Sequence, residues 1–132
     1  MIVVDASVLV TALVLDDGDG DRARQRLRDE LLAAPELVDL EVASVLRRLQ
    51  LNSKLAVGRA ELALTDLAAL PMERAPHRPL LFRCWSLRKN LTVYDAAYVA
   101  LAEALAATLL TADAALARSA RRTCSVELLP LT

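Results

Sequence analysis

Four acidic residues, Asp5, Glu41, Asp95 and Asp113, are the strongest candidates for chemistry in this 132-residue sequence. They come from distant parts of the chain, and each is predicted to lie near the end of a helix or strand. Carboxylates that converge repel one another and raise one another's pKa values unless a cation lies between them. Ligation by oxygen alone suits Mg²⁺ or Mn²⁺ with retained water molecules. Such a site activates water for phosphodiester cleavage.

Two of these acids follow predicted strands, and each also has an ordinary explanation. Asp5 ends the apolar run Ile2-Val3-Val4, so it either faces the crevice outside the carboxyl ends of the strands or serves a turn or a helix cap. Asp113 comes just after a strand predicted at 108–111. Taken alone, it suits the first turn of a helix better, where the helix dipole stabilises a negative charge and Thr111 would be the N-cap.

The other two acids are predicted to lie on helices. Glu41 flanks the apolar stripe of its helix, and a carboxylate at that edge is costly to desolvate without a partner. Asp95 stands three residues after Thr92, the spacing of a capping box with Asp in place of Glu. The alanine-rich stretch that follows Asp95 would let this helix pack close to the sheet. Only the combination of all four acids favours a shared site.

Other catalytic devices find little support. The only histidine, His77, lies in a proline-flanked context typical of a loop. The sequence contains no G-x-S-x-G, Walker A, G-x-G-x-x-G or H-E-x-x-H motif. Cys84 and Cys124 are far apart, and we interpret them as ordinary thiols of a reduced compartment. The acid-rich stretch 16–21 resembles a calcium loop, but Arg22 and Arg28 occupy positions that need Gly and Glu, so we expect a helix-capping loop.

Composition limits the remaining possibilities. Hydrophobic residues make up 55% of the chain and its length suits one domain, so we expect a single folded domain over 1–132. A net charge of −1 gives no bulk attraction to nucleic acid, and 3% aromatic content disfavours an aromatic base-stacking platform. The apolar N-terminus lacks a basic leader region, and no run reaches membrane-spanning length. We therefore expect a soluble, cytoplasmic protein with no membrane contact.

Hydrophobic periodicity predicts alternating strands and helices. This alternation indicates an α/β fold in which a parallel sheet is covered on both faces. The predicted strands are 2–4, 31–34, 71–75, 108–111 and 126–129. The predicted helices are 6–14, 22–30, 38–51, 58–70, 80–89, 92–107 and 112–121.

Four stretches taken together resemble the PIN-domain family and, within it, the VapC-type toxins. They are Val3–Ser7, Pro35–Leu46, Tyr94–Ala102 and Leu110–Ala117. The resemblance implies a three-layer α/β/α PIN domain whose five-stranded parallel sheet has the order 3-2-1-4-5. It also implies that the four acids form a Mg²⁺ site in which Mn²⁺ can substitute. Ser7 and Thr111 would be supporting polar groups around that site.

The resemblance further implies a ribonuclease, acting on RNA as an endonuclease and as the toxin of a type II VapBC-type pair. Such a toxin would bind a small cognate antitoxin and form a homodimer. Some relatives carry another acid shortly after the position of Asp113, whereas this chain has Ala114, Ala115 and Leu116. This departure predicts weaker metal binding, or a second site that substrate phosphate completes. Solvated helix faces explain the candidate RNA-contacting residues equally well: Arg47, Arg48, Arg83, Arg88 and Lys89.

Two alternatives belong to other classes of protein. A haloacid-dehalogenase-like phosphatase also places an Asp after its first strand, but it needs a second acid where this chain has Ser7. The other alternative is a catalytically weak PIN-like scaffold that binds RNA or protein. The four acids argue against such a scaffold, and a calorimetric test of metal binding would separate it from an enzyme.

Overall fold

The computed structural model describes all 132 residues. Its strands form one parallel sheet of order β3-β2-β1-β4-β5, which confirms the predicted class and order. The strands are β1 (Ile2–Val4), β2 (Leu32–Pro35), β3 (Glu73–Ala75), β4 (Thr108–Thr111) and β5 (Val126–Leu128).

The helices follow the predicted order with small shifts at their ends. They are α1 (Ala6–Val14), α2 (Gly18–Leu27), α3 (Leu37–Leu51), α4 (Val57–Ala69), α5 (Leu81–Ser86), α6 (Val93–Leu105) and α7 (Ala114–Ala120), with a 3₁₀ turn at Arg78–Leu80. None of them combines the length and apolar character that a membrane crossing requires.

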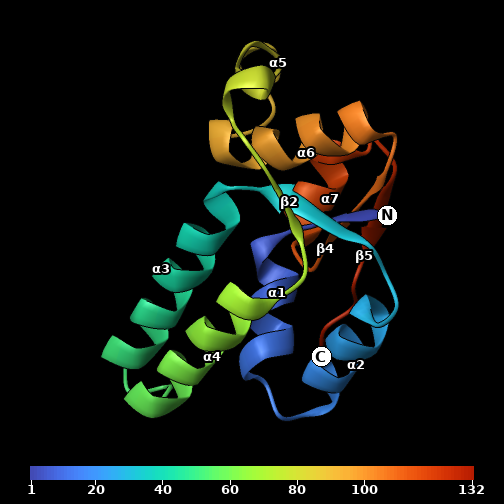
Figure 1. Ribbon diagram of the computed structural model, residues 1–132. Helices are drawn as coiled ribbons and strands as arrows, with labels where there is room; N and C mark the ends of the chain where they lie inside the picture. The colour runs from blue at the N-terminus through green and yellow to red at the C-terminus, as the bar shows by residue number, and fades with distance from the viewer.

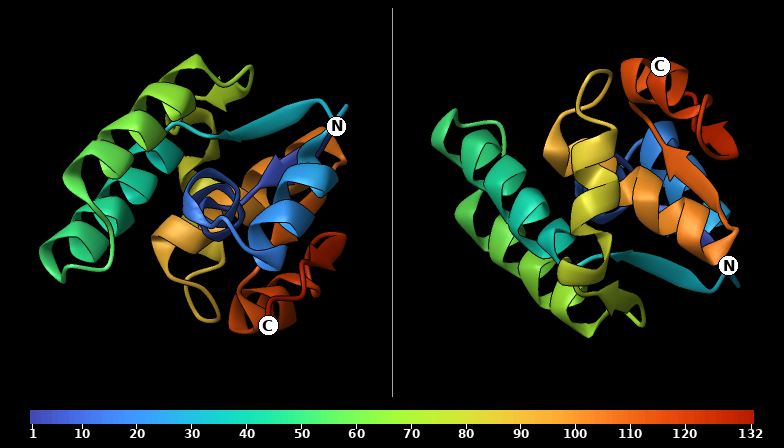
Figure 2. Two further views of the ribbon diagram at one scale, coloured as in Figure 1. Left: turned by 90° about the horizontal axis from the view of Figure 1, so that it is seen from below. Right: turned by 90° about the horizontal axis from the view of Figure 1, so that it is seen from above.

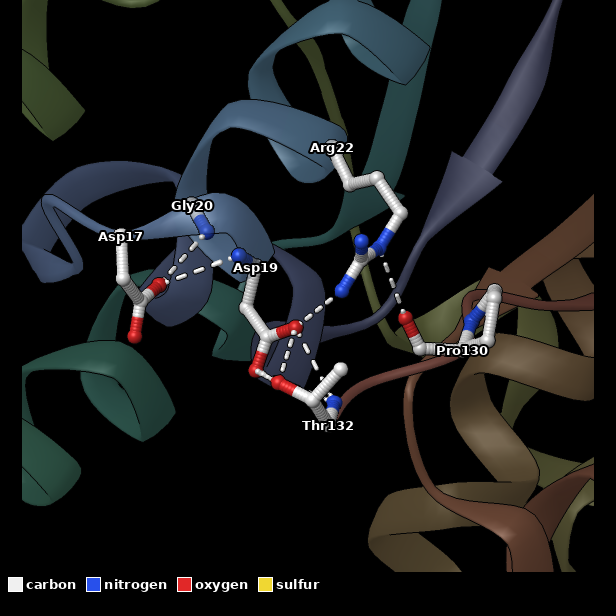
Figure 3. A network of polar contacts seen from close by, with 6 residues as sticks. All are labelled: Asp17, Asp19, Gly20, Arg22, Pro130 and Thr132. Carbon is white, nitrogen blue, oxygen red and sulfur yellow. Dashed lines mark hydrogen bonds and ion pairs between the residues drawn. The ribbon is translucent and has the colours of Figure 1, made fainter.

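Three predicted helix boundaries were wrong by three or four residues, one of them the end of α2, which is Leu27 instead of residue 30. Helix α2 begins at Gly18 instead of residue 22, because the Asp17 carboxylate caps it by accepting from the N–H groups of Asp19 and Gly20, both at 3.1 Å (Figure 3). The helix expected to reach residue 89 ends at Ser86. Beyond that residue the backbone N–H groups bond to carbonyls three residues back, a tighter turn than an α-helix makes.

Helices cover both faces of the sheet. Figure 1 shows α6 and α7 on one side, and α1 and α2 on the other. Helices α3 and α4 form a hairpin that leans away from the sheet (Figures 1 and 2). Helix α6 contacts β1, β2 and β4. Its inward side is rich in buried alanines, which allow the helix to lie close to these strands.

The central strands are buried, as continuous apolar runs predict for a parallel sheet. All of β1 is buried, and in β4 only Thr108 is partly exposed. The two strands pair in register, with Val4 opposite Leu110. The Asp5 N–H then donates to the Leu110 carbonyl at 2.9 Å, so the carboxyl ends of β1 and β4 lie side by side.

Candidate active site

Asp5 lies at the carboxyl end of β1, in the N-cap position of α1, but its side chain makes no capping bond. Only 7% of the residue is exposed. Its Oδ2 accepts hydrogen bonds from Ser7 Oγ at 2.6 Å and Thr111 Oγ1 at 2.9 Å. The helix-cap explanation for this side chain was therefore wrong, and two hydroxyls orient the carboxylate.

Ser7 and Thr111 connect Asp5 to the end of β4. Ser7 Oγ accepts from the Ala112 N–H, and Thr111 Oγ1 accepts from the Asp113 N–H, both at 3.0 Å. A hydroxyl carries one hydrogen, and here both hydroxyl hydrogens go to Asp5. Backbone donors thus fix the two hydroxyls as acceptors, and the hydroxyls in turn fix the Asp5 carboxylate.

Asp113 is exposed and caps α7. Its Oδ1 accepts from the N–H groups of Ala115 at 2.9 Å and Leu116 at 3.2 Å. The expectation that Thr111 would be the N-cap was wrong, because Asp113 occupies that position. Capping engages Oδ1, which leaves Oδ2 of Asp113 available to the crevice.

Asp95 lies in the first turn of α6 and is half-buried. Its N–H donates to Thr92 Oγ1 at 3.1 Å, so Thr92 is the N-cap that the sequence spacing predicted. Burial raises the pKa of the Asp95 carboxyl, and the negative charges of Asp5 and Asp113 raise it further. The Asp95 carboxylate therefore lies in the field of both strand-end acids.

Glu41 reaches the same region from α3. It is half-buried, and its Oε1 accepts from the Tyr98 hydroxyl at 2.6 Å. Burial is the main cause that raises the Glu41 pKa, and the charges of Asp5 and Asp95 add to it. Burial likewise raises the Tyr98 pKa, together with the Glu41 hydrogen bond and charge.

The fold thus brings the four acids into one electrostatically coupled cluster. None of them forms an ion pair with Lys or Arg, although the chain contains seven ion pairs elsewhere. No three acids are close enough to make a closed metal cage. Magnesium binds through one or two carboxylates and keeps several water molecules. The all-oxygen, cation-free donor set fits a hydrated divalent cation of this kind.

The other residues considered in the sequence either contact a partner within the protein or are exposed without an ion pair. His77 Nε2 accepts from the Leu37 N–H at 3.0 Å at the start of α3. The Arg83 guanidinium pairs with the Glu103 carboxylate, with Nε–Oε1 and Nη2–Oε2 distances of 2.7 and 2.9 Å. The Arg88 guanidinium lies 4.5 Å from the centre of the Trp85 ring. Arg47, Arg48 and Lys89 are exposed and have no ion-pair partner.

Sequence reasoning missed Tyr98 as a functional candidate. Its signal was its place one helical turn after Asp95, as a large aromatic residue within the alanine-rich stretch that follows that acid. The largest concavity of the molecule, about 620 Å³, lies elsewhere. It borders the carboxyl half of α1 and the amino end of β2 and contains none of the four acids. We place the candidate site at the acids, because coupled charges with raised pKa values indicate chemistry more directly than size does.

Comparisons with known proteins agree with this architecture. The family model described as PIN domain matches residues 2–122. VapC ribonuclease Mb0985 of Mycobacterium bovis is 45% identical over 130 residues, covering 98% of this chain and 99% of the relative. Ribonuclease VapC1 of Mycobacterium tuberculosis is 41% identical, covering 96% of each chain.

Two solved structures share the fold. The crystal structure of PAE2754 from Pyrobaculum aerophilum has a TM-score of 0.70 at 23% identity, covering 95% of this chain and 81% of that one. The crystal structure of FitAcB from Neisseria gonorrhoeae has a TM-score of 0.68 at 16% identity, covering 96% of each chain. At these identities the likeness concerns the fold alone.

Proposed function

This chain belongs to the PIN domain family, and we propose that it is a magnesium-dependent ribonuclease of the VapC type that cuts RNA at the acidic cluster. Relatives named as VapC ribonucleases, 37–45% identical over nearly the whole chain, support the ribonuclease activity. The cluster itself supports the metal dependence. Burial and the charges of neighbouring acids raise the pKa values of Glu41 and Asp95, yet no basic side chain forms an ion pair with any acid of the cluster.

The residues of the cluster have distinct tasks in this proposal. A bound Mg²⁺, or Mn²⁺ in its place, would supply a polarised water molecule and stabilise the departing oxygen. Asp5, Glu41, Asp95 and Asp113 hold the site's negative charge. Ser7 and Thr111 keep the Asp5 carboxylate in one orientation, since both donate to its Oδ2. The Asp113 carboxylate is fixed by its cap on α7.

RNA contacts require local positive charge, because the chain as a whole carries a net charge of −1. Arg47, Arg48, Arg88 and Lys89 are exposed without a carboxylate partner. Arg88 and Lys89 border the apolar surface of α5, so we propose that phosphates of the substrate contact Arg47 and Arg48 on α3. Arg83 is a weaker candidate, since Glu103 already pairs with its guanidinium.

We also propose that the protein is the toxin of a VapBC-type pair and binds a small antitoxin. The names of its relatives support the toxin assignment. Co-expression with the product of a short adjoining reading frame tests this: a stable complex without RNA cleavage is expected. Rapid cleavage in the presence of that product would contradict the pairing.

The homodimer implied by the family also has a surface that supports it. We define the α5 face as Leu40, Leu81, Phe82, Trp85 and Tyr94, all exposed; Phe82 is 86% exposed. Shared concavities join Leu81 to Tyr94 and Tyr94 to Leu40, and Phe82 and Trp85 are carried by the same short helix as Leu81. Aromatic side chains of this kind are enriched at the centres of protein interfaces.

Charge on the α5 face favours a second copy of the chain as its occupant. Exposed Arg88 and Lys89 follow α5 in the chain and exposed Glu36 lies just before α3, all without ion-pair partners. A two-fold contact sets each surface against itself, so a face with both signs is self-complementary. Phe82→Asp should convert dimer to monomer in sedimentation experiments. A dimer of unchanged affinity, or a monomeric unaltered chain, would contradict this assignment.

The ribonuclease proposal is tested by following RNA cleavage with added Mg²⁺. We expect cutting that EDTA stops and that Asp5→Asn abolishes, whereas Asp66→Asn, at an exposed acid of α4 without an ion pair, leaves it unchanged. The scaffold alternative predicts neither cleavage nor Mg²⁺ binding by calorimetry. Full activity in EDTA, or undiminished cutting by Asp5→Asn, would refute the proposal.

A further inference from the structure

Tyr98 is the largest fully buried side chain of the protein. It lies on the inward side of α6, among alanines. Packing there needs only the ring, and a phenylalanine would fill nearly the same space. A buried hydroxyl without a partner is unfavourable, so the position of this one is informative. Its hydrogen bond goes to Glu41 Oε1, 57 positions away in the sequence, at 2.6 Å.

Glu41 needs a restraint of this kind. It is carried by α3, which belongs to the hairpin that leans away from the sheet (Figure 2). Its side chain is long, and both Asp5 and Asp95 act on it with negative charge. Without a donor, repulsion and the gain in hydration would turn the carboxylate toward solvent. The Tyr98 hydroxyl, anchored on a helix that packs on the central strands, opposes that movement.

We propose that Tyr98 is a positioning residue, whose hydroxyl holds the Glu41 carboxylate toward Asp5 and Asp95 before a divalent cation binds. The inference rests on the proposed function, since it assigns a task within the same site. The geometry suits that task, because the phenol engages Oε1 and leaves Oε2 of Glu41 without a hydrogen-bond partner. Tyr98 thus does for Glu41 what Ser7 and Thr111 do for Asp5.

The same helix supplies a matched control. Tyr94 lies one turn before Tyr98, is 68% exposed, and its hydroxyl has no hydrogen bond within the protein. Tyr94→Phe and Tyr98→Phe therefore remove the same atom, in one case from a hydroxyl without a partner and in the other from the hydroxyl that donates to Glu41. A general effect of losing a tyrosine hydroxyl would appear in both variants.

The test measures Mn²⁺ affinity by calorimetry on the full chain without RNA. Loss of a hydrogen bond that orients a metal ligand typically weakens affinity about 10–100-fold, so we expect a loss in that range for Tyr98→Phe and none for Tyr94→Phe. In a Glu41→Gln background, Tyr98→Phe should add little further loss, because it acts through Glu41. Thermal unfolding without metal checks that the variants remain folded.

A measurement on the unaltered chain does not depend on folding of the variants. The protein has two tyrosines, so labelling the Cζ atoms gives two NMR signals. The Tyr98 signal should move with Mg²⁺ addition, with a midpoint equal to the Kd that calorimetry gives for Mg²⁺ under the same conditions. An unmoved Tyr98 signal, or equal Mn²⁺ affinity of Tyr98→Phe and the unaltered chain, would overturn the inference while the proposed function stands. Absence of Mn²⁺ binding by the unaltered chain would overturn both.

Discussion

The molecule contains two regions rich in carboxylates. In one of them basic side chains pair with the acids, and in the other they do not. Around the start of α2, each acid has a donor. Asp17 caps the helix and Asp19 pairs with Arg22 (Figure 3). Asp21 pairs with Arg24 at 2.7 Å. Asp19 also accepts from the backbone N–H and hydroxyl of Thr132. These contacts, led by the Thr132 N–H, hold the pKa of Asp19 below its ordinary value.

The cluster of Asp5, Glu41, Asp95 and Asp113 has the reverse character. It has hydrogen-bond donors but no cation, and burial with mutual repulsion raises the pKa values of Glu41 and Asp95. This difference shows that residue type alone does not distinguish an acid that stabilises the fold from an acid that forms a ligand site. Acids that stabilise a fold are compensated within the chain, whereas uncompensated acids are tolerated at a site that a ligand completes.

The largest expected effect comes from Asp95→Asn, which should separate activity from stability. Removing one charge from the proposed metal site should reduce RNA cleavage by more than about 100-fold. The same change relieves repulsion from Asp5 and Asp113, so the melting temperature without metal should rise or stay level. Cleavage assays and thermal unfolding measure the two effects. A variant that cuts normally would contradict the functional assignment of the cluster.

The opposite outcome is expected for Asp19→Asn. Here the lost charge is compensated in the folded state by Arg22 and Thr132, so its removal should lower the melting temperature. RNA cleavage below that temperature should remain, because Asp19 lies outside the cluster. Circular dichroism melts and the same cleavage assay provide the readouts. If Asp19→Asn lost activity while keeping its stability, the division into a structural and a functional acid region would be wrong.

The sequence predicted most of what positions the cluster. The bounds of β1 and β4 were predicted residue for residue, because each is a short buried run with an acid one or two positions beyond its end. The start of α2 was not, since two glycines and a run of aspartates are typical of a turn. In the structure Asp17 caps the helix, and a Cβ at Gly20 would overlap the Leu15 carbonyl, so glycine is required there.

The hydrogen bond between Tyr98 and Glu41 could not be predicted from the sequence pattern. The four acids were identified because each lies near the end of a predicted element, which sequence periodicity can locate. The Tyr98 hydrogen bond depends instead on how closely α6 approaches the sheet and on the direction in which α3 leaves it. Both are results of tertiary packing, and no local spacing encodes them.

The smallest effect that the comparison predicts is a pH dependence of opposite sign in the two regions. A carboxyl whose pKa is raised on folding binds its proton more tightly in the folded state. Glu41 and Asp95 should therefore destabilise the metal-free protein as pH rises from their ordinary values, near 4, through their raised ones. Asp19, with a lowered pKa, stabilises the fold above its ordinary value, and that contribution is lost as pH falls through the lowered one.

Urea unfolding at a series of pH values separates the two contributions. The first comparison is between the unaltered chain and a Glu41→Gln, Asp95→Asn double variant. The difference in their free energies of unfolding should decline as pH increases. The difference in free energy of unfolding between the unaltered chain and Asp19→Asn should instead grow as pH increases. Saturating Mg²⁺ should remove or reverse the first slope, since a bound cation favours the ionised acids, and should leave the second unchanged. A first slope that Mg²⁺ does not alter would mean that the repulsion among these acids is not what a cation relieves.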